Sequence, residues 1–321
     1  MRKRSDPSVP RPLLLTIVLV GLATGWSVAQ VGEDTLPREA ALRASSWFTI
    51  WSACGALCVA LYLLIFLFGY RQIASSELDL HRISWTHWLG WLGEFVVLIS
   101  AAFAGVSLVT SRLSLPEIPL TNAQWRIAFF TLVAILAAAP SAIGLWIVSG
   151  EITFVTSHWL DGGSPDQQVY VLRRYLKLTS LIPGCLTAMA TALTAGVVQT
   201  SFLRSALIDS GTVSAATYPP EFVTLYGGAF AAAIALVYVP SQMQARYCGA
   251  CLRDCAAERL QEPSTAEVGR SEIEEWLKDV QGVSSINSAL GLDSSLLQKS
   301  QAALGVLAPF LATFVTGFLH F

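Results

Sequence analysis

The sequence has little charge. Only 13% of its 321 residues are Asp, Glu, Lys or Arg, whereas a soluble globular domain carries about 25%. Hydrophobic residues make up 54% of the chain, and its mean hydropathy is +0.56. The composition therefore predicts an integral membrane protein. The formal net charge of −2 excludes the basic field that attracts nucleic acid, and no nucleic-acid-binding motif is present.

Motifs that carry catalytic chemistry are also missing. The chain has four histidines, and neither a Ser-His-Asp set nor an HExxH sequence can be assembled from it. Cys248, Cys251 and Cys255 lie close together, but a fourth metal ligand is missing nearby, so no metal site is predicted. We interpret these cysteines as packing residues or as thiols near the bilayer. We expect neither a cofactor nor an enzymatic activity.

Long hydrophobic runs, by contrast, are abundant. A helix that spans a bilayer needs about 20 mostly apolar residues. Spans are predicted at about 13–28, 47–68, 88–110, 127–148, 181–203 and 222–240, and a further apolar segment occupies 301–321. The predicted fold class is therefore all-α, a polytopic transmembrane helical bundle of six to seven spans with a small helical intracellular C-terminal region.

Both terminal segments have an alternative interpretation. Residues 1–29 also have the pattern of a signal peptide, with a basic start, an apolar centre and the small residues Ser27-Val28-Ala29. We favour retention as a first span, and cleavage would leave the remaining topology unchanged. Residues 302–321 reach about 30 Å as a helix, just enough to span. The alternative is a hydrophobic helix buried in the core of an intracellular oligomer, and spanning is favoured.

The basic residues orient the predicted bundle. With the N-terminus inside, 15 of the 20 Lys and Arg residues fall in inside segments and 5 fall outside. Because cytoplasmic loops carry an excess of Lys and Arg, this bias predicts a cytoplasmic N-terminus unless residues 1–29 are cleaved. Arginine outnumbers lysine by 16 to 4, a usage associated with GC-rich bacterial genomes. We therefore expect the bacterial cytoplasmic (inner) membrane.

Three regions follow from this pattern. Residues 1–240 form the transmembrane domain and include an intracellular helical loop at 149–180, where Ser164-Pro165 predicts a helix start. Residues 241–300 form an intracellular helical region with a capping box at 271–274. Residues 301–321 are the C-terminal hydrophobic segment. Sixty residues make a poor core alone, so 241–300 should pack against the first intracellular piece or a neighbouring subunit.

The fifth predicted span carries the pattern that most strongly indicates function. Small or hydroxylated residues recur there at steps of three and four, which places them on one helix face. They are Ser180, Gly184, Thr187, Thr191, Thr194 and Ser201. Such a stripe is typical of a tight seam between two helices. It also suits a helix that lines a water-filled pore, and both interpretations are open at this point.

Charged side chains supply two further candidates. Glu94 lies within the third predicted span, where an ionisable group is a functional candidate by default. The alternative is a protonated acid at interfacial depth. Arg173, Arg174 and Lys177 lie at the membrane end of the 149–180 loop. They suit anionic lipid headgroups, and alternatively an anionic ligand.

Together these features favour an oligomeric membrane channel or pore gated from its intracellular helices. By architectural analogy it would be a bacterial effector in stress or phage (antiviral) defence. The alternatives are a secondary transporter that uses Glu94 as a coupling carboxylate, and a noncatalytic assembly or partner-binding subunit. The missing internal repeat counts against the common transporter plans. Expected partners are the lipid bilayer, further copies of the chain, and an intracellular ligand or protein.

Overall fold

The structure is a computed structural model that describes residues 11–30, 37–75, 123–160, 165–216, 218–261 and 296–318. Within these residues the regular elements are α-helices, as the composition predicts. They are α1 (Arg11–Gln30), α2 (Pro37–Ala44), α3 (Ser46–Ser75), α5 (Ala123–Leu160), α6 (Pro165–Thr179), α7 (Leu181–Asp209), α8 (Glu221–Gln261) and α11 (Leu296–Phe318).

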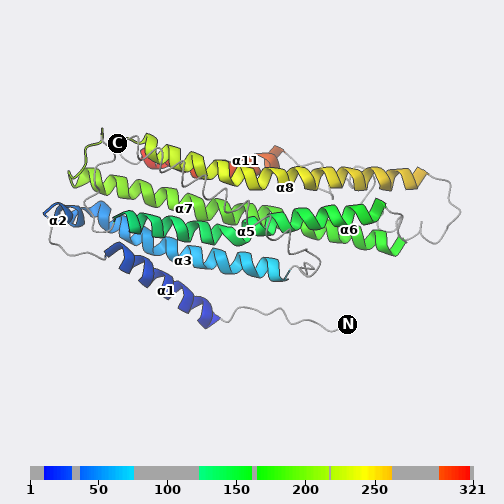
Figure 1. The fold of residues 1–321 in the computed structure, drawn as a ribbon, viewed down its shortest axis with the longest axis horizontal. Helices are drawn as coiled ribbons and strands as arrows, with labels where there is room; N and C mark the ends of the chain where they lie inside the picture. Colours follow the sequence, from blue (N-terminus) through cyan, green and yellow to red (C-terminus); the bar gives the residue numbers. More distant parts are fainter. Residues whose placement is uncertain are drawn as a thin grey trace.

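The long helices lie side by side along the long axis of the molecule (Figure 1). Helix α7 occupies the centre, because it packs against α3, α5, α8 and α11. Helix α1 packs along α3, and α11 packs against both α7 and α8. At one end, here called the α2 end, α3, α5 and α8 begin and α7 finishes. At the other, the α6 end, α6 packs against α5.

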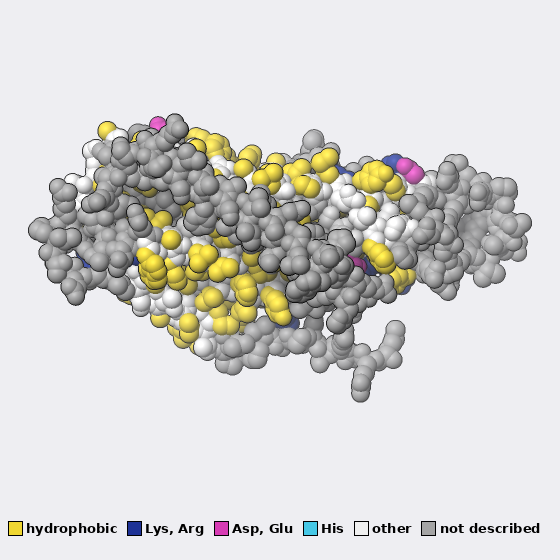
Figure 2. Space-filling view, in the orientation of Figure 1, with side chains coloured by type: hydrophobic (Ala, Val, Ile, Leu, Met, Phe, Trp, Pro, Cys, Tyr) yellow, Lys and Arg dark blue, Asp and Glu magenta, His cyan; other side chains and the backbone are white. Residues whose placement is uncertain are grey.

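Among the described residues, four helices are long and apolar enough to cross a membrane. Their candidate spans are Ser46–Arg71, Trp125–Ser157, Tyr170–Asp209 and Glu221–Asp254. They contain four of the predicted spans and indicate an integral membrane protein. Figure 2 agrees, because hydrophobic side chains dominate the described surface of the face it shows and charges are few.

The described residues contain four helices long enough to span a membrane, fewer than the six to seven spans that the sequence predicts. The apolar stretches of α1 and α11, Leu14–Gln30 and Ser300–Thr316, have no more than 17 residues each. At about 1.5 Å per residue this length reaches about 26 Å, short of a hydrocarbon layer of about 30 Å. The predicted span at 88–110, with Glu94, lies outside the described residues.

Glycines allow α1 and α11 to pack closely on the bundle. A Cβ atom at Gly21 of α1 would lie 2.6 Å from Cα of Ala60 in α3. One at Gly227 of α8 would lie 2.6 Å from the carbonyl oxygen of Pro309 in α11. Both helices therefore contact their neighbours backbone to backbone, the arrangement that small residues favour between membrane helices.

Polar contacts join helix ends at the α2 end. Ser45, between α2 and α3, donates a 2.7 Å hydrogen bond to the carboxylate of Asp209 at the end of α7. The buried guanidinium of Arg126 in α5 donates through Nη1 to the carbonyl oxygen of Ala29, 3.0 Å away. These bonds tie the ends of α1 and α7 to the starts of α3 and α5.

At the α6 end, the helices continue past the predicted spans. Helix α5 runs to Leu160 and α8 runs to Gln261 through Pro240, without a break at the predicted boundary. Helix α6 begins at Pro165, where the sequence predicts a helix start, and it buries Val171, Leu172 and Tyr175. Helix α6 contacts the extended part of α8, because Tyr175 Oη donates to the carbonyl oxygen of Ala245 in α8, 2.8 Å away.

Candidate functional site

The predicted stripe starts at Ser180, just before α7, and its half toward the α6 end is exposed. Ser180, Gly184, Thr187 and Thr191 are all exposed there. The hydroxyl of Thr187 donates to the carbonyl oxygen of Pro183 at 2.9 Å, and that of Thr191 donates to Thr187 at 2.7 Å. Both hydroxyl hydrogens are therefore used within the helix. The lone pairs of the two hydroxyl oxygens can still accept hydrogen bonds from groups outside the helix.

Toward the α2 end, the same stripe becomes a contact between helices. Ser201 is buried, and its Oγ atom accepts a 3.0 Å hydrogen bond from Thr316 Oγ1 of α11. Ser201 in turn donates to the carbonyl oxygen of Val197. Thr194 is half-buried, and its Oγ1 atom has no hydrogen-bond partner within the described part of the chain. The stripe thus changes along α7 from an exposed face to a helix seam.

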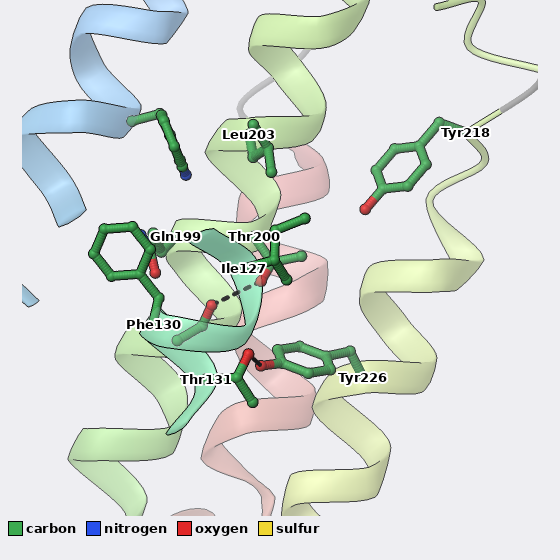
Figure 3. A pocket seen from close by; sticks show the side chains of 10 residues that line it. Ile127, Phe130, Thr131, Gln199, Thr200, Leu203, Tyr218 and Tyr226 are labelled. Carbon is green, nitrogen blue, oxygen red and sulfur yellow. Dashed lines mark hydrogen bonds between the residues drawn. The ribbon is translucent and has the colours of Figure 1, made fainter. Parts of the chain in front are cut away.

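A cavity of about 50 Å³ lies on another face of α7, and the sequence did not predict it (Figure 3). Its lining comes from α3, α5, α7, α8 and the connection between α7 and α8. The described residues that line it are Trp51, Ile127, Phe130, Thr131, Gly196, Gln199, Thr200, Leu203, Tyr218 and Tyr226. At about 100° per residue, its α7 residues lie roughly 150° around the helix from the stripe. The two features are therefore separate.

Polar groups meet across this cavity. Thr131 of α5 and Tyr226 of α8 share a 2.9 Å hydrogen bond between their hydroxyl oxygens (Figure 3). Thr200 donates to the carbonyl oxygen of Gly196 in its own helix at 3.0 Å. Tyr218 points its hydroxyl toward the cavity from the connection between α7 and α8 (Figure 3).

Gln199 is the most constrained of these polar residues. Gln199 is only 4% exposed. Its Nε2 atom has no hydrogen-bond partner in the described residues. The amide fits because α3 has a glycine opposite it, and a Cβ atom at Gly55 would stand 3.1 Å from Nε2 and 3.0 Å from Phe130 Cζ. A buried amide donor in this state costs about 1–3 kcal/mol.

Electrostatics at the cavity favour neutral hydrogen-bonding groups. Among the described residues that line it, none is charged. Burial raises the pKa of the Tyr218 phenol, and the nearby Arg204 guanidinium partly opposes that rise. Arg204 also holds the connection in place, because its Nε donates to the Tyr218 carbonyl oxygen at 2.8 Å. Tyr218 therefore remains a protonated hydroxyl near neutral pH and can donate a hydrogen bond.

The three predicted anion-binding residues differ in their surroundings. Arg173 and Lys177 are exposed on α6. Arg174 instead turns toward α5, where Nη2 lies 3.6 Å from Glu151 Oε2, and both side chains are only 10% exposed. This ion pair joins α6 to α5, so Arg174 has a packing role. Arg173 and Lys177 remain candidates for anionic lipid headgroups.

Four cysteines lie in two pairs on α3 and α8, and Cys185 is buried on α7. Cys54 and Cys58 are neighbours on α3, with their sulfur atoms 3.8 Å apart. Cys248 is buried on α8 and accepts a 3.7 Å hydrogen bond from Gln244, while Cys251 is half-buried. The side chain of Cys255 lies outside the described residues. Within the described part of the chain, no group of three His, Cys, Asp or Glu side chains could hold a metal ion.

Comparison with known proteins finds no relative of this chain. The chain matches no protein-family model, no curated protein and no solved structure. Its function is therefore inferred from the bundle, the stripe and the cavity themselves.

Proposed function

We propose that the protein is an oligomeric membrane channel or pore, with the exposed half of the α7 stripe facing the conducting path. The observation that carries this proposal is the run of Ser180, Gly184, Thr187 and Thr191, exposed on the central helix of the bundle. Hydroxyl groups gain nothing from contact with lipid tails, whereas water or ions can use their free lone pairs. In a symmetric ring of subunits, this face would line the axis.

Other exposed faces of the bundle suit lipid. Between Glu221 and Arg246, the exposed side chains of α8 include the hydrophobic residues Leu225, Leu236, Val239 and Met243. The contrast between this face and the hydroxyl-bearing face of α7 supports different environments for the two. It also provides matched positions for a control, since both faces belong to long apolar helices.

We extend the proposal to the number of spans. The close backbone contacts of α1 with α3 and of α8 with α11 support the insertion of α1 and α11 with the four long helices. Helix α11 also follows α7, because Gly305 lies against Leu186 and Thr316 lies against Ser201. A thinner bilayer around the protein would accommodate their shorter apolar lengths. With a span at 88–110, the predicted seven would be complete.

A gate at the α6 end is part of the proposal. Helix α6 leads into α7 through a single turn residue, Ser180, which itself has helical backbone angles. Helix α6 is joined to α5 by the Arg174–Glu151 ion pair and to α8 by the Tyr175 hydrogen bond. A ligand or partner that moved α6 would therefore move the start of the stripe. The predicted orientation puts this end in the cytoplasm.

The test is ion flux through liposomes that contain the purified full chain. Thr191→Trp should reduce the flux of K⁺ or Cl⁻ at least tenfold by filling the path. Leu236→Trp, on the hydrophobic face of α8, should leave it unchanged. Arg174→Met should raise the flux by loosening α6. The proposal fails if neither the wild-type chain nor the Arg174→Met variant conducts, or if both tryptophan variants behave alike.

A secondary transporter is the alternative that one specific observation favours. The cavity beside Gln199 is small, lies among four helices and combines hydrogen-bonding groups with a largely apolar lining, as a site for a solute would. Glu94, the predicted coupling carboxylate, lies outside the described residues. Exchange of labelled solute across the membrane without net ion flux would favour the transporter over the channel.

A further inference from the structure

We infer that the Ala29–Gln30 peptide bond is a latent processing site, which the folded bundle closes by docking α1 and by a hydrogen bond from Arg126. The sequence marks this bond, because Ser27-Val28-Ala29 before Gln30 has the pattern of a signal-peptidase site. The inference concerns the covalent fate of α1. It goes beyond the proposed pore, which depends on the exposed stripe of α7.

The marked bond is buried at the end of α1. Ala29 is 0% exposed and Val28 is 9% exposed, whereas the preceding Trp26 and Ser27 are exposed. Both buried residues belong to a hydrophobic cluster that includes side chains of α3, α5 and α7. Helix α1 continues to Gln30, so the bond also lies within regular helix. A peptidase acts on a chain that has opened, and the docked form of α1 therefore offers it no substrate.

Arg126 of α5 holds the same bond. Its Nη1 atom donates a 3.0 Å hydrogen bond to the Ala29 carbonyl oxygen, and Arg126 is only 1% exposed. The last carbonyl groups of a helix have no partner inside it, and their partial negative charge attracts a cation. The Ala29 carbonyl is also the group that a peptidase would attack. Hydrolysis would add one water across the bond and leave a carboxylate on Ala29 and an ammonium on Gln30.

Glycines determine how closely α1 docks. A Cβ atom at Gly25 would lie 2.6 Å from Cα of Ala56 and 2.7 Å from the carbonyl oxygen of Gly55, both backbone atoms of α3. Gly21, Gly25 and Ala29 recur at steps of four residues, so they share one face of the helix. The contact that brings the two backbones together therefore also carries Ala29 into the bundle.

The bond lies at the end of the bundle that the predicted orientation places outside, where signal peptidase acts. Helix α1 finishes at the α2 end, opposite the α6 end that is predicted to be cytoplasmic (Figure 1). An α1 that had not docked would present the bond to the enzyme, whereas a docked α1 keeps it closed. Docking thus separates the two interpretations of residues 1–29, and the buried bond favours retention as a span.

The experiment is intact mass spectrometry of the full chain, purified from bacterial membranes that contain signal peptidase. The wild-type protein should keep residues 1–29 and show the full mass of 34.6 kDa. Arg126→Met leaves the marked sequence unchanged but removes a charge-assisted hydrogen bond, so the fraction cut after Ala29 should rise about tenfold. Arg204→Met is the matched control, because Arg204 donates to Tyr218 instead and should leave α1 attached.

A second pair of variants tests docking by shape and covers the case in which Arg126→Met does not fold. Gly25→Val places a side chain against the backbone of α3 and should also expose the bond, whereas Thr24→Val, at an exposed position, should not. A wild-type chain without residues 1–29 would overturn the inference. So would Arg126→Met and Gly25→Val proteins that both stay whole or are cut only at other bonds. Thr191→Trp should block the proposed pore and leave α1 attached, which separates the two proposals.

Discussion

Thr316 of α11 donates a 3.0 Å hydrogen bond to Ser201 of α7, and both residues are buried. This contact joins the C-terminal apolar helix to the central helix of the bundle, across 115 positions of sequence. It lies near the last turn of α11, so it holds that helix along α7 rather than only at its beginning.

Removal of this hydrogen bond should destabilise the bundle modestly. A neutral hydrogen bond contributes about 0.5–1.5 kcal/mol, and bonds between membrane helices lie in the lower part of that range. Thr316→Val should therefore lower the unfolding midpoint of the protein in detergent. Thr224→Val should have little effect, because that hydroxyl bonds only to the carbonyl oxygen of Pro220, the residue just before its own helix. Equal effects of the two variants would show that the contact adds nothing.

Substitution of Gly227 should displace α11. A Cβ atom there would lie 2.6 Å from the Pro309 carbonyl oxygen, which is backbone and cannot turn aside. Gly227→Ala should cost about 1–3 kcal/mol, the usual range for overpacking. The neighbouring Gly228→Ala is the control, because its nearest contact would be Phe310 at 3.8 Å. Thermal unfolding of both purified variants checks this, and a stable Gly227→Ala protein would contradict it.

The Arg174–Glu151 ion pair should contribute more than an exposed pair. Both side chains are 10% exposed, so removal of one partner leaves a charge largely away from water. Glu151→Gln should destabilise the α6 end by an amount on the order of 3 kcal/mol. Arg173→Met should change stability by less than about 0.5 kcal/mol, because Arg173 is exposed. Limited proteolysis near residue 165 provides the measurement, with faster cleavage expected only for Glu151→Gln.

Stability should decline in alkaline solution partly because of Tyr218. Burial raises the pKa of its phenol above the ordinary value of 10.0, so the folded state retains a proton that the unfolded chain loses. This contribution is complete below about pH 10 and disappears as the pH rises through the folded-state pKa. Tyr218→Phe should make the alkaline decline shallower. Tyr247→Phe, at an exposed site, should leave it unchanged when unfolding is followed from pH 9 upward.

Several features of this protein follow from its sequence alone. Low charge and long apolar runs predict helices in a membrane, because a bilayer gives backbone groups no partner outside the helix itself. The apolar runs at 47–68, 127–148, 181–203 and 222–240 accordingly lie within the four long helices. The start of α6 at Pro165 was also predictable, because a cap followed by proline acts within a single turn.

Only the tertiary structure shows which residues of different helices are in contact. The periodicity of α7 shows that Thr187, Thr191 and Ser201 share a face, but it contains no information about what lies opposite each of them. Thr191 is exposed, whereas Ser201 meets α11. Arg174 likewise looked equivalent to Arg173 until α5 brought Glu151 beside it. Neighbours on one helix are determined by the period of the helix, and neighbours on two helices are determined by packing.

The cavity is the clearest case of this difference. Thr131, Gln199 and Tyr226 are unremarkable residues in three separate apolar helices, and no spacing connects them. They meet because α5, α7 and α8 pack side by side and because Gly55 of α3 leaves room for the Gln199 amide. The sequence alone determined that these helices are apolar and long, since those properties depend on composition and local hydrogen bonding. Only the packed bundle decided that a cavity with hydroxyl groups at its wall lies among them, because that depends on which side chains fill the space between helices.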